Sequence, residues 1–296
     1  MDQRSARKQI YDCFPEITVR RSRRIPTGSD NLVLQINGEY IFRFPKFLES
    51  EKRLKIEIAL LSKIRGNLSI PVPDYTLVWK TSRKYPRSFA GYPRLKGVPV
   101  SNRSLGSKTR SRLATQISSL LKELHNIRTK PNTLPIPKYT PKTWVRFISK
   151  HHDQIRKTVY PLLHHHQRVA SELLWRSFLA ELANAHFTPR LIHGDLGTEN
   201  ILYNPLTGKL TGVIDWGFAQ VSDPALEFSH LYHHNPKLAR ETLNRYGRTS
   251  EDFERRLRWY IRTEPYYDVM WGISNNWKKG KFDGLRSLNN LLKQPG

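Results

Sequence analysis

Two β-rich runs of apolar residues flank Asn37-Gly38 in the stretch LVLQINGEYIFRF. Asparagine and glycine both tolerate positive φ, and this pair is the strongest short signal for a hairpin turn. The pattern therefore predicts two antiparallel strands joined by a tight turn. Similar runs in IPVPDYTLVW and RSFAGYPRL predict two further strands, so the first hundred residues form a small antiparallel sheet.

A helical pattern follows the hairpin. In ESEKRLKIEIALLSKIRG, apolar residues recur at helical spacing at Leu54, Ile58, Leu61 and Ile64, and Gly66 is placed to end the helix. The sequence therefore predicts one amphipathic helix that packs its apolar stripe against the sheet.

An acidic residue interrupts this stripe. Glu57 lies three residues after Leu54 and four before Leu61, so its side chain is expected to face the sheet. A buried carboxylate needs a cation, and Arg43, in the middle of the second strand, is the candidate. Such an arginine could pair with Glu57 and also bind a phosphate. The pattern leaves open a second arrangement, with Arg43 on the surface and Glu57 at the edge of the stripe.

Beyond this sheet, helical periodicity dominates. SRLATQISSLLKELHNI carries a leucine-rich face, and the proline-rich TLPIPKYTPK is typical of a connection between helices. We therefore predict an α+β chain with a lobe boundary near residue 97. Residues 1–97 would form a nucleotide-binding lobe, and residues 98–296 a mostly helical lobe for catalysis and acceptor binding.

Composition adds limits to this picture. A chain of 296 residues with 38% hydrophobic residues can bury a sizeable core. The single cysteine, Cys13, excludes an intramolecular disulfide and favours a reducing compartment. No run of about 18 uncharged apolar residues is present, so we expect a cytoplasmic protein without a membrane span. The triplet His164–His166 is interpreted as a solvated helix surface, because three adjacent histidines cannot share one helix face.

Charge is distributed unevenly. The formal net charge is +25, yet residues 191–230 hold one Lys or Arg against five Asp or Glu. A basic chain invites a nucleic-acid interpretation, but zinc-finger spacing, RNP-like aromatic motifs and a basic zipper region are all missing from the sequence. We therefore expect weak polyanion binding at most, and no specific nucleic-acid partner.

The acidic segment contains two motifs that suit phosphoryl transfer. LIHGDLGTENIL places Asn200 five residues after Asp195, and VIDWG places Asp215 twenty residues after Asp195. This transfer needs a carboxylate that orients or deprotonates the attacking hydroxyl, and an acid and an amide that hold Mg²⁺ on the phosphates. The spacing matches the kinase H-R-D-x-x-x-x-N and D-F-G motifs. A predicted hairpin at TGKL would bring Asn200 and Asp215 to the same end of neighbouring strands.

Together with these motifs, the segments GSDN, EYIFRFPK, IPVPDY and SFAGYPRLKG resemble the aminoglycoside phosphotransferase family, whose catalytic motif is H-G-D-x-x-x-x-N, and most closely its 2″-type kinases. The resemblance implies a bilobal, protein-kinase-like fold and a monomeric enzyme that phosphorylates an aminoglycoside, which would confer resistance. It implies catalytic roles for Asp195 and for His193, which would brace the loop.

The resemblance also implies a set of nucleotide and metal ligands. Asn200 and Asp215 would coordinate Mg²⁺. Arg43 would replace the phosphate-binding strand lysine, with Glu57 as its helix partner.

The loop TGSDNLVL lacks the glycine pattern of protein kinases, so phosphate enclosure would depend on Gly28, Ser29 and neighbouring amides.

The nucleotide base would be bound near the end of the fifth strand. Tyr92 corresponds to the residue that shapes the base pocket, and the backbone of Pro93, Arg94 and Leu95 would hydrogen-bond the base, with proline unable to donate. A bulky tyrosine restricts adenine, so both ATP and GTP remain possible donors. The alternative is that Tyr92 only packs against the sheet.

For the acceptor, the candidates are acids and one aromatic residue. They are Glu199, Glu227, Glu264, Asp268 and Trp271, the last three at helical spacings of four and three. The net charge opposes a polycationic acceptor at long range. Two alternatives therefore stay open: a kinase of the same fold acting on a macrolide, sugar or choline-like alcohol, and a non-catalytic protein that binds nucleotide and RNA.

Overall fold

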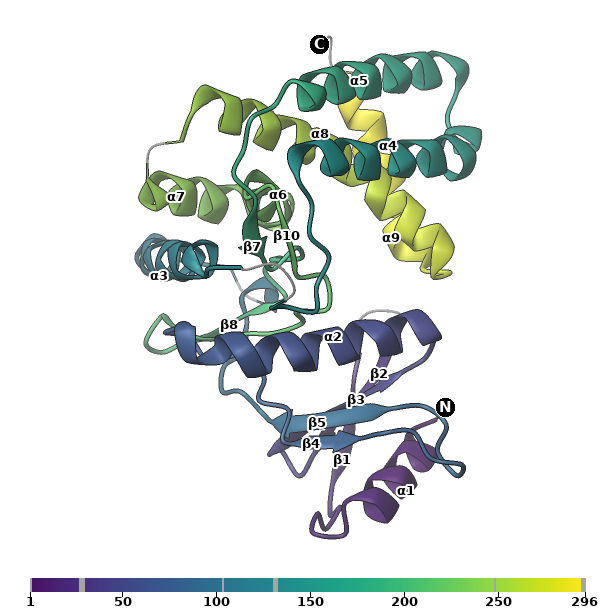
Figure 1. The fold of residues 1–296 in the computed structure, drawn as a ribbon, viewed down its shortest axis with the longest axis vertical. Coiled ribbons are helices and arrows are strands. Elements are labelled where there is room, and N and C mark those ends of the chain that lie inside the picture. Colours follow the sequence, from purple (N-terminus) through teal and green to yellow (C-terminus); the bar gives the residue numbers. More distant parts are fainter. Residues whose placement is uncertain (1, 27–29, 103, 130–132, 248, 294–296) are drawn as a thin grey trace. The chain divides into compact units, whose positions relative to one another are not determined.

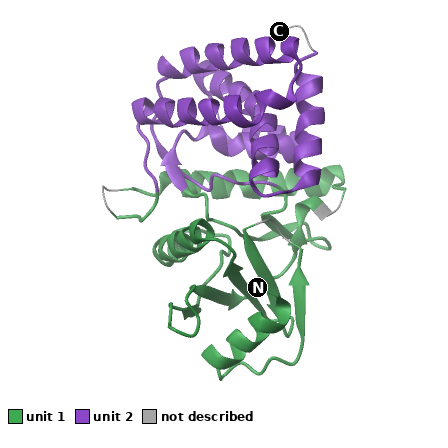
Figure 2. Ribbon diagram, turned by 90° about the vertical axis from the view of Figure 1, so that its right-hand side faces the viewer, with its two compact units in different colours: residues 1–136, 198–219 green, residues 137–197, 220–296 purple. Residues whose placement is uncertain are grey.

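The computed structural model describes residues 2–26, 30–102, 104–129, 133–247 and 249–293. The chain divides into two compact units (Figure 2): residues 1–136 with 198–219, and residues 137–197 with 220–296. The predicted boundary at residue 97 does not coincide with this division. The reason is that α3 (Ser107–Asn126) packs on β9 (Lys209–Val213) within the first unit, where the Gln116 side chain accepts a hydrogen bond from the Leu210 amide.

The first unit is built on an antiparallel sheet of five strands. In spatial order these are β1 (Ser22–Ile25), β2 (Asn31–Ile36), β3 (Tyr40–Pro45), β5 (Phe89–Pro93) and β4 (Leu77–Trp79). Strands β2 and β3 pair as predicted, and Asn37 and Gly38 have φ values of 55° and 83°. The Asn-Gly hairpin is therefore confirmed.

Two helices cover the two faces of this sheet (Figure 1). The helix α1 (Gln3–Cys13) buries Ala6 and Ile10 against an aromatic cluster of Phe42, Phe44 and Phe89. The helix α2 (Leu48–Ile64) packs on β3 and β5. Its predicted stripe is confirmed: Leu54, Leu61 and Ile64 are buried and Ile58 is half-buried, and a 3₁₀ turn, η1 (Arg65–Asn67), contains Gly66 and ends the helix.

A second sheet of the first unit contains β6 (Val98–Pro99), β8 (Ile201–Asn204) and β9, followed along the chain from β6 by the 3₁₀ turn η2 (Val100–Asn102). Strands β8 and β9 form the predicted TGKL hairpin. Just before β6, Gly97 has a φ of 102°, and a Cβ there would lie 2.7 Å from the Tyr203 carbonyl oxygen. Only glycine fits this connection, because the conformation is left-handed and the neighbouring strand is too close for a side chain.

The second unit is mostly helical. Its helices are α4 (Pro141–Thr158), α5 (His165–Ala183), α6 (Ala225–His234), α7 (Pro236–Tyr246), α8 (Glu251–Ser274) and α9 (Lys278–Leu291), with a 3₁₀ turn η3 (Tyr160–Leu162). Two short strands, β7 (Arg190–Ile192) and β10 (Gln220–Ser222), pair antiparallel. The histidine triplet is exposed at the start of α5. Within the described ranges, no helix is long and apolar enough to span a membrane.

A buried polar cluster fixes α6 to α8. Asp223, which is fully buried, accepts a hydrogen bond from the Ala225 amide at the start of α6. The same carboxylate accepts from Arg256 Nε at 2.6 Å and from the Tyr260 hydroxyl at 2.8 Å, both on α8. Because every carboxylate oxygen has a donor, this charge is tolerated in the core and sets the position of α6.

Candidate active site

The predicted ion pair on the sheet is present. Arg43 extends from β3 with only 8% of its surface exposed, and its Nη1 donates to Glu57 Oε2 at 2.7 Å. Its Nη2 donates to Asp215 Oδ1 at 2.8 Å. One guanidinium therefore bridges the carboxylate of α2 and the carboxylate of the VIDWG motif. The alternative arrangement, with Arg43 on the surface, is wrong.

Tyr75 completes this network, which we call the Arg43 network (Arg43, Glu57, Tyr75 and Asp215). The Tyr75 hydroxyl donates to Glu57 Oε1 at 2.9 Å and lies 3.3 Å from Arg43 Nη1. Burial raises the pKa of Glu57, an effect that Arg43 opposes, and burial together with Glu57 raises the pKa of Tyr75 far above its ordinary value. Both oxygens of the buried Glu57 thus have donors, which is the condition for a stable buried charge. The sequence pattern missed Tyr75, although IPVPDY contains it.

The predicted metal ligands lie at one end of the β8–β9 hairpin. The Ile214 amide donates to the Asn200 carbonyl at 3.0 Å, and Asp215 follows in a left-handed conformation with a φ of 66°. This conformation turns Asp215 out of the strand direction and leaves 44% of its side chain exposed. A carboxylate and an amide oxygen are ligands that Mg²⁺ accepts, with phosphate oxygens and water completing its shell. The residues present fit such a site.

In the second unit, the catalytic-loop motif begins directly after β7. His193 is fully buried, and its Nδ1 accepts a hydrogen bond from the Asp195 amide at 3.3 Å. Its own amide donates to Glu227 Oε2 at 2.6 Å. Asp195 is half-buried. These contacts are the ones expected of a histidine that holds the loop carrying Asp195.

The side chain of Glu227 contacts this loop through the amide of His193. It is fully buried, and burial raises its pKa to about 7, although the amides of His193 and Gly194 oppose that shift. Among the described residues, its Oε1 has no hydrogen-bond partner. A side chain with no exposed surface cannot contact a substrate, so the predicted role of Glu227 as an acceptor ligand is corrected to a support of the loop.

The predicted acidic face on α8 is formed, but its carboxylates already have partners. Glu264 Oε1 lies 2.9 Å from His230 Nδ1, and Asp268 Oδ2 lies 3.1 Å from His233 Nε2, both histidines on α6. Trp271 is half-buried on the same helix. Neither histidine was predicted from the sequence, although their spacing of three residues in EFSHLYHH places them on one helix face.

The other acid predicted to bind the acceptor, Glu199, is exposed and belongs to the first unit.

The predicted base-binding strip lies at the end of β5. Tyr92 is buried with Val33 and Ile41, and its ring contacts Tyr75 edge-on at 5.0 Å, so it packs against the sheet. The Arg94 amide donates to the Glu39 carbonyl at 2.6 Å. Pro93 has no amide hydrogen and the Arg94 amide already has an acceptor, so the Leu95 amide is the remaining backbone donor of residues 93–95. Gly28 and Ser29 lie outside the described residues.

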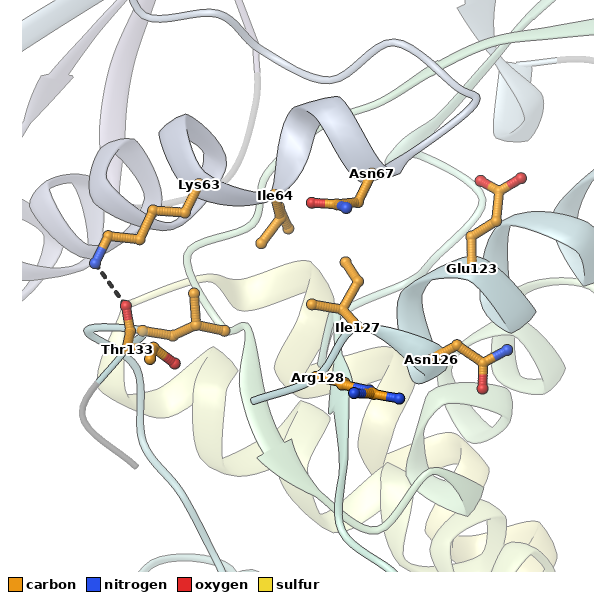
Figure 3. A pocket seen from close by; sticks show the side chains of 9 residues that line it. Lys63, Ile64, Asn67, Glu123, Asn126, Ile127, Arg128 and Thr133 are labelled. Carbon is orange, nitrogen blue, oxygen red and sulfur yellow. Dashed lines mark hydrogen bonds between the residues drawn. The ribbon is translucent and has the colours of Figure 1, made fainter. Parts of the chain in front are cut away.

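A hollow of about 560 Å³ in the first unit lies between the carboxyl ends of α2 and α3 (Figure 3). Its lining residues are Lys63, Ile64, Asn67, Glu123, Asn126, Ile127, Arg128, Thr133 and Leu134. Lys63 Nζ donates across it to the Thr133 carbonyl at 2.5 Å. None of the residues predicted to bind nucleotide, metal or acceptor lines this hollow.

The chain is similar to known phosphotransferases in sequence and in fold. Residues 21–260 match the model of the phosphotransferase enzyme family. The structures of aminoglycoside 2′-phosphotransferase-IIIa with GDP, and of APH(2″)-IIIa with GDP and kanamycin, superpose with TM-scores of 0.86 at 23% and 25% identity. They cover 99% and 97% of this chain and 99% and 98% of theirs. The predicted kinase-like α+β fold is thereby confirmed.

Two further proteins are similar to this chain. Macrolide 2′-phosphotransferase type I superposes with a TM-score of 0.73 at 16% identity, covering 97% of this chain and 98% of that one. Viomycin phosphotransferase of Streptomyces vinaceus is 29% identical over 142 residues, 47% of this chain and 47% of that protein. The match thus spans about half the length of this curated relative. With 240 of its residues matched by the family model and the kinase motifs intact, the chain belongs to the phosphotransferase enzyme family.

Proposed function

We propose that this phosphotransferase moves the γ-phosphoryl group of ATP or GTP to a hydroxyl of a small molecule, with the 2″-hydroxyl of an aminoglycoside as the first acceptor to test. The observation that carries the proposal is the Arg43 network, in which a buried arginine links the helix acid Glu57 to the motif acid Asp215. Protein kinases likewise place a strand cation beside a helix glutamate to contact the phosphates, and a motif aspartate to hold Mg²⁺.

On the donor side, Arg43 would hold the phosphates. Its fork already contacts Asp215, so nucleotide binding would exchange that contact for a phosphate oxygen while Glu57 and Tyr75 keep the guanidinium in place. Asn200 and Asp215 would hold Mg²⁺. When bound, that ion neutralises charge on the phosphate oxygens.

On the acceptor side, Asp195 would orient the hydroxyl and accept its proton. The acceptor oxygen forms a bond to the γ-phosphorus as the bond from that phosphorus to the bridging oxygen breaks, and the nucleoside diphosphate leaves. The proton passes from the hydroxyl to Asp195 and then to solvent. The His193 and Glu227 contacts described above would keep Asp195 in place.

The choice of donor would depend on Tyr92 and Leu95. A buried tyrosine at the end of β5 narrows the space beside the base, and the Leu95 amide would donate to a carbonyl such as guanine O6. The GDP complexes of the superposed relative support guanine nucleotides as donors alongside ATP.

A second acceptor class has support from the structure. Because Glu264 and Asp268 are paired with histidines, a macrolide or another alcohol with few amino groups is the alternative acceptor. The superposed macrolide 2′-phosphotransferase shows that this fold is compatible with that class. In either case we expect a monomer acting in the cytoplasm, where Cys13 stays reduced.

The test is nucleotide turnover with ATP and with GTP against a panel of aminoglycosides, macrolides, sugars and choline-like alcohols. The expected result is acceptor-dependent release of nucleoside diphosphate, with phosphorus NMR locating the new phosphate on an acceptor hydroxyl. If no acceptor stimulates release of nucleoside diphosphate, and if RNA affinity falls steeply with salt, the result would instead indicate a non-catalytic RNA-binding protein.

A further inference from the structure

Two parallel ion pairs link α6 to α8 in the second unit. His230 and His233, one turn apart on α6, meet Glu264 and Asp268, one turn apart on α8, at 2.9 Å and 3.1 Å. The inner pair is largely buried, with side-chain exposures of 18% for His230 and 12% for Glu264. The outer pair is half-buried, at 29% for His233 and 31% for Asp268. We call these four side chains the histidine–acid ladder.

Each carboxylate of the ladder raises the pKa of the histidine that it contacts. Burial opposes protonation of His230, but Glu264, Asp195 and Glu227 outweigh it and raise its pKa to about 10. Burial alone would raise the pKa of Glu264, yet His230, His233 and His234 hold it below its ordinary value.

In the outer pair, the hydrogen bond to Asp268 raises the pKa of His233, with burial and His230 acting against that shift. Protonation of both histidines is therefore favoured by the carboxylates that they contact.

The histidines of the ladder lie on the helix that supports the loop carrying Asp195. His230 follows Glu227 by one turn of α6. Glu227 accepts from the amide of His193, whose Nδ1 accepts from the Asp195 amide. Asp195 is also one of the charges that raise the pKa of His230.

An amino group of an acceptor that approached Glu264 or Asp268 would have to displace a histidine already bound there. The new charge-assisted hydrogen bond to the amine would be offset by loss of the hydrogen bond to the histidine.

We propose that His230 and His233 are specificity-determining residues, which neutralise Glu264 and Asp268 and so select acceptors with few amino groups over polycations. The proposal rests on the proposed function, because it assumes that the acceptor binds at this face. A polycation needs several free carboxylates, and this chain supplies histidine partners for Glu264 and Asp268. An acceptor with one amino group or none loses nothing by this arrangement.

The experiment uses His233→Gln in the full chain, since the outer pair is more exposed than the inner pair and its loss leaves Asp268 partly in contact with solvent. Kanamycin, a polycation, and erythromycin, a macrolide with one amino group, are titrated calorimetrically in the presence of a non-hydrolysable nucleotide. We expect His233→Gln to bind kanamycin about tenfold more tightly than the unmodified protein, because a neutral glutamine competes less with an ammonium group for Asp268 than a histidine that can be protonated. Erythromycin affinity should change less than about twofold.

Two further variants test the cause of this tighter binding. The double variant His233→Gln with Asp268→Asn should lose it, because the freed carboxylate is then absent. His166→Gln, which alters an exposed histidine of α5, should leave both affinities unchanged.

Equal kanamycin affinities in His233→Gln and the unmodified protein, or no detectable binding to either, would overturn the proposal. Phosphate transfer to both compounds is measured in parallel. Transfer without an affinity shift would refute the role of the histidines and leave the proposed function intact. An affinity shift with no transfer to any acceptor would refute the proposed function and retain the role of the histidines in binding.

Discussion

Replacement of Arg43 by methionine should destabilise the protein by removing the partner of a buried charge. Glu57 has no exposed surface, and among the described residues its carboxylate accepts from two side chains, Arg43 at 2.7 Å and Tyr75 at 2.9 Å. After the change, Tyr75 is the remaining side-chain donor. Methionine fills most of the space of the arginine stem, so the main effect is the loss of the ion pair and not a cavity.

The size of the effect follows from this geometry. Breaking a buried ion pair by removing one partner costs about 3–5 kcal/mol. Because the Tyr75 hydroxyl still donates to Glu57, we expect the lower end, about 3 kcal/mol. Changing Glu57 to glutamine in the same chain removes the buried charge, so the double variant should recover most of this loss and lie about 1 kcal/mol below the unmodified protein.

Urea unfolding followed by circular dichroism measures both free energies. Arg94→Met, at an exposed arginine, serves as the matched control and should change the free energy of unfolding by less than about 0.5 kcal/mol. The reasoning would be refuted if Arg43→Met cost less than about 1 kcal/mol, or if the double variant were as unstable as the single one.

Three further outcomes are expected. Asp215→Ala should abolish the Mg²⁺-dependent part of nucleotide affinity, measured by titration with and without the ion, while the Arg43–Glu57 contact keeps the unit folded. Tyr92→Leu should raise kcat/KM for ATP relative to GTP several-fold, because it opens space beside the base; an unchanged ratio in steady-state assays would assign Tyr92 to packing alone. Glu227 has its pKa raised from 4.5 to about 7, so its contribution to stability is present below pH 4.5 and lost as pH rises through 7. Between pH 4.5 and pH 7, the free energy of unfolding of Glu227→Gln should therefore rise by about 3 kcal/mol relative to that of the unmodified protein. Plots of unfolding free energy against pH that run parallel for the two proteins would contradict the raised pKa of Glu227.

Local patterns predicted the elements that depend on neighbouring residues. Asn37-Gly38 specified the first hairpin, and the stripe through Leu54 specified α2. The long-range pair of Arg43 and Glu57 was one of two arrangements that the pattern left open, since an acid on an apolar stripe either pairs with a cation or lies at the edge of the stripe. The hairpin that carries Asp215 followed from its turn sequence in the same way.

Features that depend on the packing of distant elements were not predictable. The pairing of His230 with Glu264 requires knowing that α6 lies along α8, and neither helix alone reveals it. The burial of Glu227 depends on the loop that follows β7, so its acidic character suggested a surface role that the structure excludes. The boundary predicted at residue 97 differs from the division into compact units, because α3 packs on the β8–β9 hairpin, which follows it by almost a hundred residues in the sequence.

The central claim is phosphoryl transfer that depends on Asp195, and transfer of labelled γ-phosphate tests it most directly. The unmodified protein and Asp195→Asn are incubated with γ-labelled ATP or GTP, Mg²⁺ and the acceptor panel, and label on the acceptor is counted. We predict that the unmodified protein labels at least one acceptor, and that Asp195→Asn binds nucleotide equally well but transfers label at least about a hundredfold more slowly. Equal transfer by both proteins would contradict the account.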